Sequence, residues 1–164
     1  MKIRKLTTLT MLLSISIILN IIEPVIPIPA MGVKLGLANI LSILALYMYG
    51  SKEFIMINFL RVFMSHLLRG SLFSVGFFLS SSGVLLSTLV LLLVFPYKKF
   101  SVFGISMVSA TMHSIGQLGM VCFIYQSIYI MNYLPIMLIL SMISGIMLGV
   151  IIKRVLRILR VDYE

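Results

Sequence analysis

The chain has 164 residues, of which 61% are hydrophobic and only 10% are charged, and its formal net charge is +9. Soluble domains carry about 25% charged residues, so this composition excludes a soluble protein and predicts one integral membrane domain over residues 1–164. The single cysteine, Cys122, excludes an internal disulfide and a cysteine-based zinc site.

Apolar runs recur along the whole chain and predict an all-α fold with six membrane-spanning helices. A spanning helix needs about 17–25 mostly apolar residues. The expected helices lie near 6–22, 35–50, 53–68, 71–95, 101–126 and 130–152. The second and third, at about 16 residues or roughly 24 Å each, are shorter than a usual hydrocarbon core. We expect them to be tilted or to cover part of a water-filled cavity.

The first predicted helix carries a stripe of small polar residues and is followed by a proline-rich loop. Thr7, Thr10 and Ser14 are spaced by three and four, as in helix contacts, so they predict either packing within the protein or a partner interface. The loop begins at Glu23 in "EPVIPIPAMGVK" and is stiffened by its prolines. Glu23 and Lys34 would anchor a lid or touch a ligand, and the alternative is a plain connector.

The third predicted helix contains a charged residue at membrane depth. Arg61, Ser65 and Arg69 are spaced by four, so they share one helical face. Two guanidinium groups on that face would suit a carboxylate or phosphate ligand. Alternatively, Arg61 pairs with Glu23 or caps carbonyls, and Arg69 reaches the membrane interface.

The fourth and fifth predicted helices are rich in small residues. Gly76 and Gly83 lie on the fourth, and Gly104, Gly116 and Gly119 lie on the fifth, where they permit close helix packing. His113 and Gln117, four residues apart on the fifth helix, therefore predict either a hydrogen-bonding wall for a ligand or a polar clamp between helices. The sequence contains only two histidines and almost no carboxylates at membrane depth, so we expect no metal site.

Basic residues predict the orientation in the membrane. With six spans, Lys34 and Arg69 fall on one side, and ten other basic residues fall on the opposite side: Lys2, Arg4, Lys5, Lys52, Lys98, Lys99, Lys153, Arg154, Arg157 and Arg160. The positive-inside rule places the larger group, and with it both termini, on the cytoplasmic side of a bacterial inner membrane. This belt also meets anionic lipid, and no nucleic-acid partner is needed to explain the charge.

Catalytic motifs are missing from the sequence. The four acidic residues are Glu23, Glu53, Asp162 and Glu164, which form no paired aspartate-rich motifs to cage the magnesium–diphosphate of prenyl transfer. There is no phosphate-binding GxxxxGK[ST] motif and no nucleophile with a plausible base. We therefore expect a binder or carrier without a cofactor rather than an enzyme.

Three stretches carry a family resemblance: "EPVIPIPAMGVKLGLANI", "GISMVSATMHSIGQLGM" and "YLPIMLILSMISGIMLGVI". They resemble the family of heptaprenyl diphosphate synthase component I, also called the Gx transporter family, which is related to the substrate-binding S components of energy-coupling-factor (ECF) importers. The resemblance implies six helices with cytoplasmic termini, a lid that includes Lys34, Gly36 and Asn39, and a signature that contains His113 and Gln117. S components dock through an alanine-x-x-x-alanine stripe, whose spacing is occupied here by Thr10 and Ser14.

The resulting expectation is an S-component-like subunit that captures a small extracellular solute for import with an ECF scaffold subunit and ATPases. The alternative is a membrane accessory subunit that works with a catalytic prenyl diphosphate synthase subunit. A structural membrane subunit is the third interpretation. The predicted ligand-binding residues are Glu23, Lys34, Asn39, Arg61, Arg69, His113 and Gln117.

Overall fold

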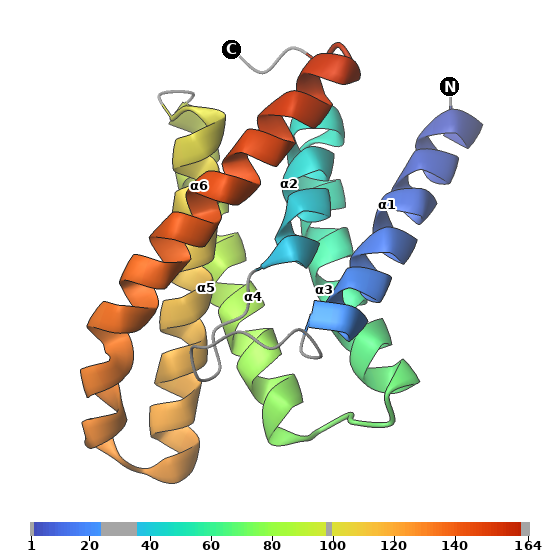
Figure 1. Cartoon of the computed structure of the whole chain (residues 1–164). Coiled ribbons are helices and arrows are strands. Elements are labelled where there is room, and N and C mark those ends of the chain that lie inside the picture. Colours follow the sequence, from blue (N-terminus) through green and yellow to red (C-terminus); the bar gives the residue numbers. More distant parts are fainter. Residues whose placement is uncertain (1, 24–35, 98–99, 162–164) are drawn as a thin grey trace.

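The computed structural model describes residues 2–23, 36–97 and 100–161, and this part of the chain is helical without strands. The α-helices are α1 (Lys2–Ile22), α2 (Leu37–Tyr49), α3 (Ser51–Leu68), α4 (Val75–Val94), α5 (Val102–Tyr125) and α6 (Leu134–Ile158). Two short 3-10 helices, η2 (Phe95–Tyr97) and η3 (Ile128–Tyr133), precede α5 and α6. Successive helices run in opposite directions, so the start of α1 and the end of α6 lie at the same end of the bundle (Figure 1).

The predicted all-α fold is confirmed, and its six helices are present. Four segments are long and apolar enough to cross a membrane: Ile3–Ile22, Val75–Tyr97, Val102–Tyr125 and Ile128–Ile158. The sixth helix begins four residues later than expected because Pro135, which suits the first turn, follows η3. It also extends six residues further, through Lys153 and Arg154, whose long side chains can reach a polar surface while the backbone stays helical. Six membrane crossings remain a prediction.

The short helix α2 lies inside the bundle. Its residues from Ala38 to Leu46 are all buried, and it contacts α1, α3, α5 and α6 (Figure 1). A helix that is hydrophobic on all sides is stable only when it is surrounded. With 13 residues, α2 is roughly 20 Å long, so its N-terminal end stops within the protein.

Glycines bring α4, α5 and α6 into close contact, as the sequence predicts for Gly83 and Gly116. A Cβ atom on Gly83 would lie 2.8 Å from the carbonyl oxygen of His113, and one on Gly116 would lie 2.7 Å from that of Ser82. Gly145 in α6 packs equally closely against α5, with 2.7 Å from its Cβ position to Cα of Met107, and Gly149 packs slightly less closely, at 3.0 Å from Phe103. Gly119, in contrast, has nothing within 4 Å of the position of its Cβ, so it has no packing role of this kind.

The described ends of the helices separate the basic residues as expected from six antiparallel spans. The start of α1, the turn between α2 and α3, the end of η2 and the end of α6 share one end of the bundle, whereas the turn after α3 lies at the other (Figure 1). At the first end, Lys5 of α1 forms an ion pair with Glu53 of α3. Lys34, Lys98, Lys99, Asp162 and Glu164 lie outside the described residues. Which end faces the cytoplasm stays a prediction.

Candidate functional site

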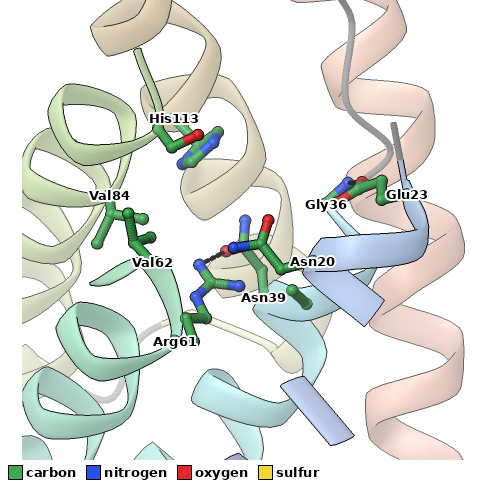
Figure 2. A pocket seen from close by; sticks show the side chains of 10 residues that line it. Asn20, Glu23, Gly36, Asn39, Arg61, Val62, Val84 and His113 are labelled. Atoms are coloured by element: carbon green, nitrogen blue, oxygen red, sulfur yellow. Dashed lines mark hydrogen bonds between the residues drawn. The ribbon is translucent and has the colours of Figure 1, made fainter. Parts of the chain in front are cut away.

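A small polar cavity lies where the N-terminal end of α2 stops inside the bundle (Figure 2). Its volume is about 20 Å³, enough for about one water molecule. Helices α1 to α5, the residue that follows α1 and the residue that precedes α2 contribute to its lining: Asn20, Glu23, Gly36, Ala38, Asn39, Arg61, Val62, Ser80, Val84 and His113. Four of the predicted ligand-binding residues, Glu23, Asn39, Arg61 and His113, therefore meet at one place, although they are far apart in the sequence.

Arg61 supplies the positive charge of this cavity. It is 3% exposed, and its Nη2 donates a hydrogen bond to Oδ1 of Asn39 at the start of α2. Its Nε is buried and has no hydrogen-bond partner among the described residues. Glu23, which carries a negative charge, lines the same cavity. An ionisable group at membrane depth is costly, so a buried arginine with a donor to spare marks a candidate binding site.

Glu23 holds the N-terminal end of α2 in place. Its Oε1 accepts hydrogen bonds from the backbone N–H of Gly36 and, at 3.3 Å, from that of Leu37 (Figure 2). Gly36 adopts a left-handed conformation, with φ of 77°, that other residues rarely take. The first N–H groups of a helix lack internal partners and favour a negative charge, so the carboxylate stabilises the beginning of α2. Glu23 thus lines the cavity and is already engaged by the backbone.

Asn20 was not among the predicted site residues, yet it links α1 to α3. Its Nδ2 donates to Oγ of Ser65 at 2.8 Å, and its backbone carbonyl accepts a hydrogen bond from Arg69. Ser16, Asn20 and Glu23 are spaced by four and three, so these buried polar residues share one helical face, which points inward. This spacing is the feature of the sequence that could have predicted Asn20 as a site residue. Arg69 itself is exposed at the end of α3 and does not line the cavity.

His113 and Gln117 are separated by the structure although they are one helical turn apart. His113 lines the Arg61 cavity, whereas Gln117 lines a mostly apolar pocket of about 240 Å³ beside Tyr133. The cause is Gly83 of α4, whose Cβ would lie 2.9 Å from both Cε1 of His113 and Cγ of Gln117. The backbone of α4 therefore lies between the two side chains.

The predicted interface stripe on α1 faces away from the protein. Thr7, Thr10 and Ser14 are all exposed, so packing within the protein buries none of the three, and a partner interface stays a prediction. Thr7 and Thr10 donate hydrogen bonds of 3.0 Å to the carbonyls of Ile3 and Leu6 one turn earlier. The predicted lid residue Lys34 lies outside the described residues. Within the described part of the chain, no three His, Cys, Asp or Glu side chains form a group that could hold a metal ion.

Comparison with known proteins gives one match. The family model described as heptaprenyl diphosphate synthase component I matches residues 12–155, which include every described residue of the cavity. No curated protein and no solved structure matches the chain. The match supports the resemblance to the synthase component and gives no support to an ECF importer. Since it covers most of the sequence, the chain belongs to the heptaprenyl diphosphate synthase component I family.

Proposed function

We propose that this chain is a membrane-embedded, non-catalytic subunit of a heptaprenyl diphosphate synthase. The family match over residues 12–155 carries the proposal, and the four helices able to cross a membrane support the membrane location. This was the alternative interpretation of the sequence. We now prefer it to the importer interpretation, because no comparison supports an importer.

The acidic residues explain why the chemistry is assigned to a partner. A magnesium ion bound to a diphosphate substrate is usually held by one or two protein carboxylates in addition to the phosphate oxygens. Of the four acidic residues, Glu23 binds the N-terminal end of α2 and Glu53 pairs with Lys5. Because these two of the four carboxylates have other partners, the proposal assigns the metal-binding carboxylates to a separate catalytic subunit.

A membrane subunit has a physical purpose in making a long prenyl chain. Burial of each CH₂ group stabilises a lipid in an apolar environment by about 0.8 kcal/mol, so the growing product increasingly prefers the bilayer. A catalytic subunit held at the membrane by this chain would release its product directly into the hydrocarbon phase. The basic residues at one end of the bundle would face the same membrane surface as the catalytic partner.

The exposed face of α1 formed by Thr7, Thr10 and Ser14 is the proposed contact for that partner. Small side chains allow close approach of a second helix, and all three of these side chains are exposed. In this arrangement the partner would lie beside α1, at the edge of the bundle (Figure 1).

Site-specific photo-crosslinking in intact membranes tests the proposal. A photoreactive amino acid replaces Thr10, and the control carries it at Phe123, which is 79% exposed on α5. We expect the Thr10 variant, and not the control, to capture a catalytic prenyl diphosphate synthase subunit. Capture of an ATPase–scaffold module would establish the importer instead, and capture of lipid alone would favour a structural subunit. Magnesium-dependent chain elongation by the purified chain alone would contradict the non-catalytic assignment.

A further inference from the structure

The outer surface of α3 and α4 carries an apolar groove directly behind the Arg61 cavity. The groove has a volume of about 340 Å³, within the range of roughly 300–1,000 Å³ that is usual for ligand pockets. Three aromatic side chains, Phe59, Phe63 and Phe77, form much of its lining, and Ser81 is its only polar side chain. Phe59 and Phe63 are nearly half exposed on the surface that would face lipid.

Two valines separate this groove from the polar cavity. Val62 of α3 and Val84 of α4 line both spaces, and Figure 2 shows them together on one side of Arg61. Of these neighbouring residues of α3, Arg61 lines only the cavity, whereas Val62 lies between the cavity and the groove. A ligand that lay in the groove and passed these two valines would reach the guanidinium.

We infer that this pair of spaces binds a prenyl diphosphate from the side of the bilayer, with the prenyl chain in the α3–α4 groove and the diphosphate toward Arg61. This inference rests on the proposed function, which supplies the substrate class. Chemical complementarity supports it independently. The groove is apolar and open to lipid, and Nε of Arg61 is a buried donor without a partner among the described residues.

The charges around Arg61 also suit an oxygen-rich head group. The Glu23 carboxylate accepts from two backbone N–H groups of the α2 end, which offset its negative charge. Asn39 accepts from Nη2 of the guanidinium, whereas Nε has no partner among the described residues and is available to a phosphate oxygen. The cavity has room for only about one water molecule, so the diphosphate would enter by displacement of Val62 and Val84.

Photolabelling of the purified full-length chain tests this site. The probe is a geranylgeranyl diphosphate analogue with a photoreactive group at the far end of its chain, and the labelled peptides are mapped by mass spectrometry. Ser81→Phe, which fills the groove, should reduce labelling about tenfold. The control Leu85→Phe adds the same ring on an exposed face of α4 outside the groove and should leave labelling unchanged.

Competition experiments separate the head from the chain. Unlabelled geranylgeranyl diphosphate should compete at concentrations roughly ten- to hundredfold lower than geranylgeraniol, as expected for one charged hydrogen bond, and inorganic diphosphate alone should not compete. Arg61→Lys, which keeps the charge but loses the planar fork, should reduce the preference for the diphosphate about tenfold. Melting temperatures of all variants show that each is folded.

Labelling outside α3 and α4, or equal competition by the alcohol, would overturn the inference. So would unchanged labelling of a folded Ser81→Phe variant. The crosslink through Thr10 does not depend on the groove, so capture of the catalytic subunit without groove labelling would refute this site and leave the proposed function intact. Groove labelling without that capture would refute the proposed function and leave a prenyl-lipid site.

Discussion

The hydrogen bond between Arg61 and Asn39 joins α3 to α2 across the polar cavity, and its strength can be measured. Both side chains are buried, at 3% and 5% exposure. We consider the two single substitutions Arg61→Met and Asn39→Ala and their combination. Methionine keeps much of the length of the arginine stem and removes the charge, so the change isolates the guanidinium.

The expected interaction energy follows from two reference values. Hydrogen bonds to charged groups contribute about 1.5–3 kcal/mol, whereas hydrogen bonds between membrane helices average about 0.6 kcal/mol with a maximum near 1.7. A buried hydrogen bond with one charged partner in a membrane bundle should lie near the upper end of the second range, so we expect about 1–2 kcal/mol. Asn39→Ala should therefore destabilise the natural chain more than it destabilises the Arg61→Met variant, in which no buried guanidinium loses its acceptor.

The assay is a double-mutant cycle with reversible unfolding of the purified protein in mixed micelles. A matched neutral pair lies one turn away, where Nδ2 of Asn58 donates to Oγ1 of Thr88 at 3.0 Å. The cycle of Asn58→Ala and Thr88→Ala should give about 0.6 kcal/mol. If the arginine pair couples no more strongly than this neutral pair, the reasoning that the charge of Arg61 is held by Asn39 is refuted.

Two further predictions concern packing and topology. Gly145→Ala should lower the free energy of unfolding by about 1–3 kcal/mol, because its Cβ would lie 2.7 Å from the α5 backbone, whereas Gly119→Ala, with open space around it, should be neutral or stabilising in the same unfolding assay. In a Cys122→Ser background, Tyr97→Cys and Tyr129→Cys place thiols in two highly exposed turns at opposite ends of α5. An impermeant thiol reagent added to intact cells should label only the Tyr129→Cys variant, and labelling of both from outside would contradict the six-span topology.

The sequence by itself determined the fold class and the positions of the helices. Helix formation in an apolar chain depends on local properties, namely long hydrophobic runs, prolines and glycines that end them, and the need to satisfy backbone hydrogen bonds in lipid. These properties can be read from neighbouring residues. For the same reason Arg61 was recognised as unusual, since its cost depends mainly on its depth in an apolar segment.

The tertiary structure decided which polar residues meet. On α1, two polar stripes exist in the sequence, and only the packing against α2 and α3 shows that Asn20 and Glu23 face inward while Thr10 faces outward. Helical spacing places His113 and Gln117 on one face, yet the backbone of α4 at Gly83 separates them into two spaces. Periodicity describes one helix alone, whereas the lining of a cavity depends on the neighbours of that helix.

The end of α2 is the clearest case of this division. The sequence predicted a short second helix and a glutamate before a proline-rich loop, but it gave no relation between the two. In the structure the short helix stops inside the bundle, and its first N–H groups find their acceptor in the carboxylate of Glu23 at the end of α1. A buried helix end requires such a partner, and only the three-dimensional packing determines which residue supplies it.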